Sequence, residues 1–115
     1  MNIDVRGILG EFMAGVGEVA EMDGAFADKF MALDGGAGKA IEPKIRELVA
    51  VGLAIEKRCK YCICVHVNGA YKAGATRDEI LAAAEVAIAM GGGPSLAYTA
   101  TVLKAAVDEF EHDFD

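Results

Sequence analysis

Three residues in the middle of the chain have the types and the spacing that thiol chemistry needs. Cys59 and Cys62 are separated by two residues, and His66 follows Cys62 by four. On an α-helix these separations put all three side chains on one face. Cys64 lies only two residues after Cys62, so it points elsewhere and we expect it to pack in the core. The spacing therefore nominates Cys59, Cys62 and His66 as one site.

The expected position of the two cysteines on a helix would activate them. The pattern predicts a helix over residues 60–73, with Cys59 at its N-terminus and Cys62 in its first turn. Unpaired backbone N–H groups and the positive end of the helix dipole stabilise a thiolate at that position. His66, one turn further along, could deprotonate the Cys62 thiol. Three basic side chains add positive charge nearby: Lys57, Arg58 and Lys60.

Glu47 is a fourth candidate, from the preceding predicted helix. If that helix packs antiparallel to the helix that carries Cys62 and His66, the Glu47 carboxylate could face this pair and exchange protons with it. Spacing alone does not require this contact.

Two other interpretations use the same residues. A zinc site could be formed by Cys59, Cys62 and His66, with His112 or Glu47 as a fourth ligand. Three ligands on one helix face bind a metal poorly without a second arm, so we expect no metal. The cysteines could also be small buried hydrophobic residues. Haem attachment is excluded because no histidine directly follows the second cysteine.

The elements that must position these residues are helices, because the apolar residues have helical spacing along the whole chain. Local signals mark several helix ends: Pro43 suits a first turn, Gly74 suits a C-terminal stop, and Thr76 with Glu79 forms a capping box. We predict an all-α, single-domain bundle of about six helices over residues 1–115. The expected helices lie near 5–19, 26–33, 43–58, 60–73, 76–90 and 94–110.

Two of these helices carry specific predictions about burial. The segment 48–55 is apolar nearly all round, so we expect it to be deeply buried. In the last helix, one face carries a stripe that we expect to pack on the core: Leu96, Ala100, Leu103, Val107 and Phe110.

Composition limits the class of protein. The chain has 115 residues, is 54% hydrophobic and contains 14 glycines, which is more apolar than one small domain can bury. We therefore expect a substantial subunit interface.

The net charge of −7 argues against nucleic-acid binding. The uncharged stretch 86–103 is broken by Gly91–Pro94, so we expect no membrane span. Without a visible signal peptide, a cytoplasmic location is expected, and an odd count of three cysteines argues against structural disulfides.

The spacing Glu47, Cys59-X-X-Cys62, His66 resembles the motif of the alkylhydroperoxidase D-like proteins, which belong to the carboxymuconolactone decarboxylase superfamily. The flanking segments 45–51 (IRELVAV) and 70–80 (AYKAGATRDEI) also resemble this family, as do Gly91–Pro94 and Tyr98. The likeness covers roughly residues 42–110. Tyr61 stands where some members carry a second histidine.

The resemblance implies an all-helical subunit in a homotrimer or homohexamer, and a thiol-dependent peroxidase. In that scheme Cys62 attacks the hydroperoxide and its sulfenic acid condenses with Cys59. Glu47 and His66 relay protons. No cofactor is expected beyond this redox-active disulfide, which an external lipoyl-like or thioredoxin-like dithiol would reduce. The alternative function is that of a non-redox family member, either a carboxymuconolactone decarboxylase-like lyase or a binding protein.

Overall fold

The structure, a computed structural model, describes residues 2–115, which contain no β-strand. The elements in chain order are α1 (Val5–Met22), α2 (Gly24–Gly36), α3 (Pro43–Glu56), α4 (Lys60–Lys72), α5 (Arg77–Gly91), α6 (Gly93–Tyr98), the π-helix η1 (Thr99–Leu103) and α7 (Lys104–Phe110). The last three follow one another without a break and form one long helix. The described residues therefore form six continuous helices, which confirms the predicted all-α fold.

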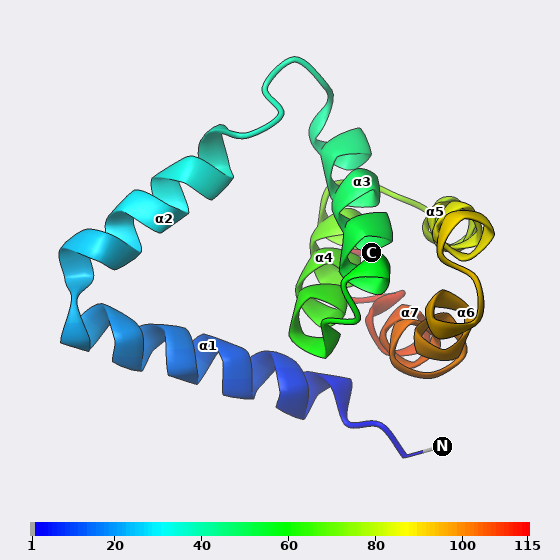
Figure 1. Ribbon diagram of the computed structural model, residues 1–115, viewed down its shortest axis with the longest axis horizontal. Helices are drawn as coiled ribbons and strands as arrows, with labels where there is room; N and C mark the ends of the chain where they lie inside the picture. Colours follow the sequence, from blue (N-terminus) through cyan, green and yellow to red (C-terminus); the bar gives the residue numbers. More distant parts are fainter. Residues whose placement is uncertain (1) are drawn as a thin grey trace.

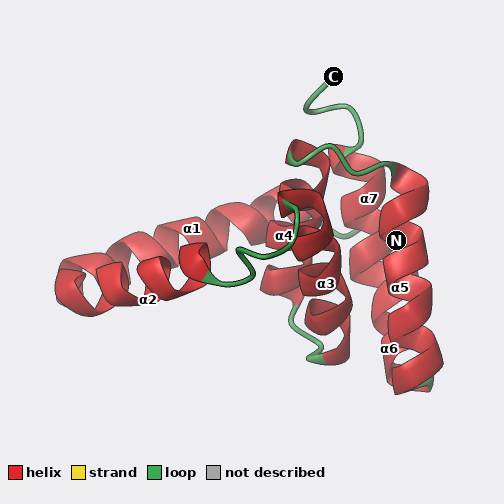
Figure 2. Cartoon of the chain, turned by 90° about the horizontal axis from the view of Figure 1, so that it is seen from above, coloured by secondary structure: helices red, strands yellow, loops and turns green. Residues whose placement is uncertain are grey.

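The helices α3 to α7 form the bundle that contains the core, and α1 and α2 extend from it as an arm (Figure 1). The α3–α4 pair has the most extensive packing and is joined by only three residues, 57–59. The view from above shows α1 and α2 reaching away from the bundle on one side (Figure 2). The fully buried large side chains come mainly from α3, α4, α5 and the last helix: Val51, Ile55, Ile63, Val67, Ile80, Leu103, Val107 and Phe110.

The predicted helix ends are confirmed where local chemistry specifies them. Pro43 is the first residue of α3, where its missing N–H has no intrahelical partner to lose. Gly74 follows the end of α4 with φ of +93°, a conformation that glycine adopts without strain. The Thr76 side chain accepts from the N–H of Glu79, and the Glu79 carboxylate accepts from the N–H of Thr76, which completes the capping box of α5.

The predicted stripe of the last helix is wrong in its first half. Leu103, Val107 and Phe110 are buried, but Leu96 and Ala100 are exposed. The cause is the π-helical turn, which takes about one extra residue and so rotates the preceding residues around the helix axis. Ser95, which is 2% exposed, faces the interior in the first half of this helix instead.

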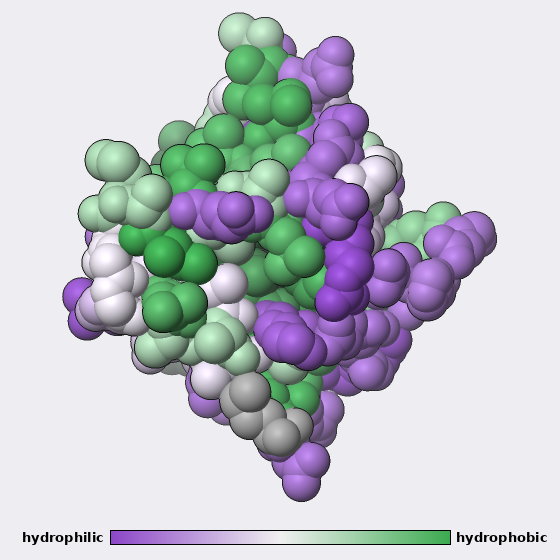
Figure 3. All heavy atoms as spheres, turned by 90° about the vertical axis from the view of Figure 1, so that its right-hand side faces the viewer, coloured by the Kyte–Doolittle hydropathy of each residue, from purple (hydrophilic) through white to green (hydrophobic). Residues whose placement is uncertain are grey.

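The prediction that segment 48–55 is deeply buried holds on one side only. Val51, Ala54 and Ile55 are buried in the core, whereas Val49 and Leu53 are more than half exposed. The reason is that α4 and α5 cover only part of the α3 surface, and a groove of about 430 Å³ lined mostly by apolar side chains remains between α3 and α5. Apolar side chains also cover much of the face of the molecule nearest α5 and α6 (Figure 3).

The arm is the least buried part of the subunit. No residue of α2 is buried, and in α1 only Val5 is. Phe26, Phe30 and Leu33 are each more than half exposed, although their spacing predicted the helix correctly. None of the helices in residues 2–115 has the length and apolar character that crossing a membrane requires.

Candidate functional site

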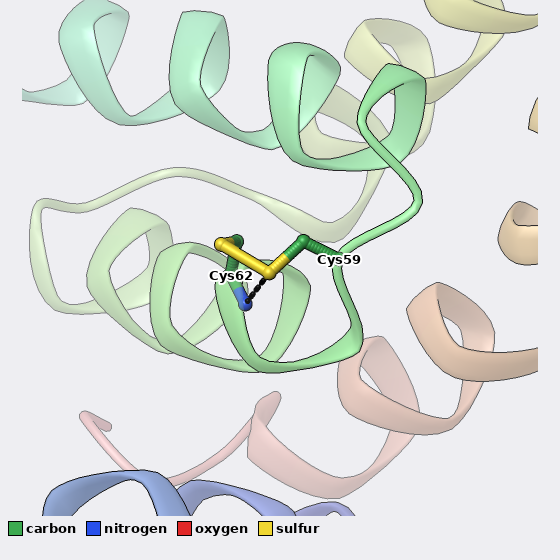
Figure 4. The surroundings of a disulfide bond; sticks show 2 residues. All are labelled: Cys59 and Cys62. Carbon is green, nitrogen blue, oxygen red and sulfur yellow. Dashed lines mark hydrogen bonds between the residues drawn. A yellow bond between two sulfur atoms is a disulfide. The ribbon is translucent and has the colours of Figure 1, made fainter.

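Cys59 and Cys62 are joined by a disulfide at the start of α4 (Figure 4). Cys59 is the N-cap residue with an extended backbone, and Cys62 lies in the first turn, so their Cα atoms are 5.2 Å apart. This Cα separation is within the range that a disulfide spans. The Cys62 backbone N–H donates to Cys59 Sγ at 3.2 Å. The helix N-terminus therefore directs a backbone donor at the first sulfur, as the sequence predicted.

Glu47 and His66 meet across the α3–α4 pair. His66 Nδ1 lies 2.8 Å from Glu47 Oε2, and both side chains are mostly buried. A carboxylate can only accept at this distance, so His66 Nδ1 carries the hydrogen of this contact. Cys62 is four residues before His66 on the same helix and hence on the same face. The structure thus brings the fourth candidate, Glu47, to the histidine that follows the cysteine pair.

Gly69 is part of this arrangement and was missed by sequence reasoning. A Cβ atom at position 69 would lie 2.8 Å from Glu47 Oε2, closer than real Cβ contacts come. The Glu47 carboxylate therefore occupies the space that the side chain of any larger residue at position 69 would fill. The sequence contains a signal for this, because Gly69 stands three residues after His66 in a helix that otherwise avoids glycine.

Arg46 is a second residue that the motif did not identify. Its Nη1 lies 3.5 Å from Glu47 Oε1, on the carboxylate oxygen that does not contact His66. The guanidinium also donates through Nε to the Ala37 carbonyl at 2.7 Å, and through Nη2 to the Asp34 carbonyl. Arg46 therefore fixes the Glu47 carboxylate relative to the end of α2.

The remaining candidates lie away from the pair. Cys64 is completely buried, and burial raises the pKa of its thiol to about 11. His112 is exposed at the C-terminal end of the chain, where its Nδ1 lies 2.8 Å from Asp115 Oδ2. In residues 2–115 no three His, Cys, Asp or Glu side chains are grouped in a way that could hold a metal ion. The expectation that Cys64 packs in the core is confirmed.

A hollow of about 540 Å³ opens beside Cys59. Residues 58–61 form one wall, and Tyr98, Thr101 and Val102 of the last helix form the other. Tyr61 separates this hollow from a second, apolar one of about 520 Å³ between α1 and α2. The Tyr61 hydroxyl donates to Glu11 Oε1 at 3.0 Å, which ties the start of α4 to the arm.

Comparison with known proteins shows relatives over most of the chain. A family model described as the carboxymuconolactone decarboxylase family matches residues 24–105. "Uncharacterized protein 4 in cox locus" from Paracoccus denitrificans is 34% identical over 100 residues, which cover 85% of this chain and 89% of that protein. An uncharacterized protein from Cupriavidus necator is 37% identical over 59 residues, about half of each chain.

The fold also matches a solved structure. The crystal structure of apo-lpg0406, a carboxymuconolactone decarboxylase family protein from Legionella pneumophila, superposes with a TM-score of 0.87 at 34% sequence identity. The match covers 93% of this chain and 96% of that one. With the family model over residues 24–105, this likeness shows that the chain belongs to the carboxymuconolactone decarboxylase family.

Proposed function

We propose that this protein is a thiol-dependent peroxidase that reduces hydroperoxides through the Cys59–Cys62 pair. The observation that carries the proposal is the combination of a disulfide at the start of α4 with a His66–Glu47 pair on the same helix face. A disulfide that closes within one helical turn can open and close with little backbone movement. The histidine–carboxylate pair provides a base for the thiol and an acid for the leaving group.

In the oxidising half-reaction, the Cys62 thiolate attacks the terminal oxygen of the hydroperoxide. The O–O bond breaks, Cys62 becomes a sulfenic acid, and the alkoxide takes a proton to leave as an alcohol. The Cys59 thiol then attacks the sulfenic sulfur, so that the disulfide forms and water leaves. His66 accepts the proton of Cys62 and returns one to the leaving oxygen, while Glu47 stabilises the imidazolium.

In the reducing half-reaction, an external dithiol opens the disulfide by two thiol–disulfide exchanges and leaves as its own disulfide. The two electrons that reduce the peroxide therefore come from the dithiol and pass through the cysteine sulfurs alone. No further cofactor takes part in this scheme. A lipoyl-like or thioredoxin-like donor has the required chemistry.

We also propose that the working form is a homo-oligomer, a trimer or hexamer. In the isolated subunit, a contiguous apolar surface on α3 and α5 stays exposed. Four of its side chains are more than half exposed: Val49, Leu53, Val86 and Met90. Exposed apolar surface of this extent is typical of subunit contacts. Sedimentation of the protein at micromolar concentration tests this point, and a monomer would contradict it.

A single-turnover thiol titration tests the peroxidase proposal. The reduced, unfolded chain should titrate as three thiols. After one equivalent of an organic hydroperoxide, two of them should be lost. Cys62→Ser should lose none, and Cys59→Ser should lose one, as a sulfenic acid that dimedone captures. An unchanged thiol count in the wild type would favour a non-redox lyase or binding protein with this fold.

A further inference from the structure

The α1–α2 arm contacts the candidate site at two separate points. Tyr61, which lies between the two cysteines, donates to Glu11 of α1 and stacks on Phe12, with the ring centroids 6.1 Å apart. At the other end of the arm, Arg46 of α3 donates to backbone carbonyls of α2 and of the residue that follows it. Among the described residues, α1 is the only helix that packs extensively on α2. The Arg46 contacts are therefore a main connection between α2 and the bundle.

The guanidinium of Arg46 joins the end of α2 to Glu47. Its Nε donates to the Ala37 carbonyl at 2.7 Å, and its Nη2 donates to the Asp34 carbonyl and lies 3.5 Å from the Asp34 carboxylate. Both carbonyls lie at the C-terminal end of a helix, where the backbone oxygens have no α-helical partner and attract cations. The third nitrogen, Nη1, lies 3.5 Å from Glu47 Oε1. One planar group thus contacts the end of α2 and the carboxylate at the same time.

The chain after α2 also lies directly on the Arg46 side chain. Gly38 has a φ of +76°, and a Cβ atom added there would lie 3.4 Å from both Cγ and Cδ of Arg46. The Arg46 side chain is only 27% exposed, although it carries a charge. Backbone carbonyls hold its head and Gly38 covers its stem. The end of α2 therefore cannot move without either moving this side chain or breaking these contacts.

The Glu47 carboxylate is held at both of its oxygen atoms. Oε2 lies 2.8 Å from His66 Nδ1, and Oε1 is the oxygen that faces Arg46. With Arg46 in place, the plane of the carboxylate is fixed and Oε2 stays directed at the imidazole. Without Arg46, the contact with His66 is the one polar interaction of Glu47 that remains in residues 2–115. The orientation of the carboxylate thus depends on Arg46.

We propose that Arg46 is a positioning residue that makes the Glu47–His66 pair depend on the position of the α1–α2 arm. With the end of α2 in place, the guanidinium holds Glu47 Oε1 and keeps Oε2 on the imidazole. When the end of α2 is displaced, Arg46 is drawn away with its carbonyl partners, and the Glu47 carboxylate is free to rotate away from His66. The inference rests on the proposed function, in which this pair exchanges protons with the Cys62 thiol.

A double-mutant cycle between Arg46 and Gly38 tests this coupling. Arg46→Met removes the charge and the donors but retains an unbranched stem. Gly38→Val adds a β-branched side chain against that stem at a positive φ, where it is strained, so it should displace the end of α2. The rate at which an organic hydroperoxide oxidises Cys62 is measured in the wild type, in both single variants and in the double variant. Urea unfolding checks the fold of each protein, and Gly38→Ala replaces the valine variant if that variant does not fold.

Arg46→Met should slow the oxidation by about two- to tenfold, the range for the loss of one intramolecular hydrogen bond. Gly38→Val should slow it by a similar factor in the wild type and should have no further effect in Arg46→Met. Arg46→Lys keeps the positive charge but lacks the planar fork, so it should not restore the response to Gly38→Val. A wild-type rate in either single variant, or effects that multiply in the double variant, would overturn the proposal.

Two matched controls separate this coupling from general destabilisation. Gly74→Val places a side chain at another glycine of positive φ, where an added Cβ meets no atom within 4 Å. Arg77→Met removes an arginine that pairs with two carboxylates near the C-terminal end of the chain, those of Asp108 and Glu111. Neither substitution should slow the oxidation. A loss of rate in these controls equal to that in Arg46→Met would overturn the assignment to Arg46.

The same cycle is measured without peroxide from the NMR signal of His66 Nδ1–H in the nitrogen-15-labelled disulfide form. Exchange of this hydrogen with water should be faster in Arg46→Met and in Gly38→Val, and no faster still in the double variant, because the Glu47 contact that retains the hydrogen is lost. An unchanged exchange rate in Arg46→Met would overturn the positioning role. If hydroperoxide fails to oxidise the wild type but this coupling is present, the peroxidase proposal is wrong and the role of Arg46 stands.

Discussion

The substitution Gly69→Ala should displace the Glu47 carboxylate without destabilising the fold. The added Cβ atom would lie 2.8 Å from Glu47 Oε2 and 3.0 Å from its Cδ. The nearest ordinary van der Waals contact is 3.4 Å, so the carboxylate has to retreat by about 0.6 Å. The 2.8 Å contact between Oε2 and His66 Nδ1 is then stretched beyond the normal hydrogen-bond range or broken.

The size of the expected effect follows from that contact. A hydrogen bond to a charged group contributes about 1.5–3 kcal/mol, and each 1.4 kcal/mol corresponds to about a tenfold change in rate. If the bond keeps its full value in the transition state, the oxidation of Cys62 by hydroperoxide should slow by about 10- to 100-fold. Stability should not fall in parallel, because replacing a glycine inside a helix by alanine stabilises the helix by about 0.5–1 kcal/mol.

The assay combines rate, stability and a structural readout. Stopped-flow fluorescence or thiol trapping gives the rate of oxidation, and urea unfolding gives the free energy of unfolding. Nitrogen-15 NMR of His66 reports whether the Nδ1–H tautomer is retained. Gly10→Ala is the matched control, because Gly10 lies in α1 with no neighbouring atom within 4 Å of its added Cβ. A Gly69→Ala protein with the wild-type oxidation rate and the wild-type tautomer would contradict the expected displacement of the Glu47 carboxylate.

Three further predictions concern other residues. In the reduced native protein, iodoacetamide at pH 8 should modify Cys59 and Cys62 but not Cys64, because burial raises the Cys64 pKa to about 11; mass spectrometry that finds native Cys64 alkylated would contradict this burial. The free energy of unfolding should be unaffected by Cys64 below its ordinary pKa of 9.0 and should decrease as the pH rises from there towards 11, because the unfolded chain loses this proton first. Burial also raises the pKa of Tyr71, so this residue should likewise lower the free energy of unfolding once the pH exceeds its ordinary pKa of 10.0. Urea unfolding at several pH values measures the combined effect of Cys64 and Tyr71. Arg58→Gly should raise the free energy of unfolding by about 0.5–1 kcal/mol, since it relieves the left-handed backbone of a residue with a side chain; a loss of stability in urea unfolding would show that the arginine side chain supports the fold.

The parts of the fold that the sequence predicts best are those with local causes. The capping box at Thr76 and Glu79, the proline that begins α3 and the glycine after α4 all act within a few residues of themselves. The shared face of Cys59, Cys62 and His66 is equally local, because it follows from helical spacing alone. These features could be predicted before any tertiary contact was known.

The features that residue spacing alone could not establish depend on contacts between distant segments; Glu47 joined the candidate site through the family resemblance, not through spacing. The contact between Glu47 and His66 spans 19 positions and exists only because α3 packs against α4. Gly69 becomes significant only once the Glu47 carboxylate lies on it. The π-helical turn at 99–103 reverses the burial expected for Leu96, and no local signal in the sequence marks it. The burial of α3 was overestimated for the same reason. An apolar sequence does not indicate which sides of a helix the neighbouring helices cover.

The Cys59–Cys62 pair is proposed to turn over hydroperoxide at the expense of a dithiol. The most direct measurement is steady-state consumption of an organic hydroperoxide with excess dihydrolipoate, for the wild type and for Cys62→Ser under identical conditions. We expect the wild type to consume many peroxide molecules per chain and Cys62→Ser to consume none above background. A wild type no faster than Cys62→Ser would contradict the peroxidase proposal.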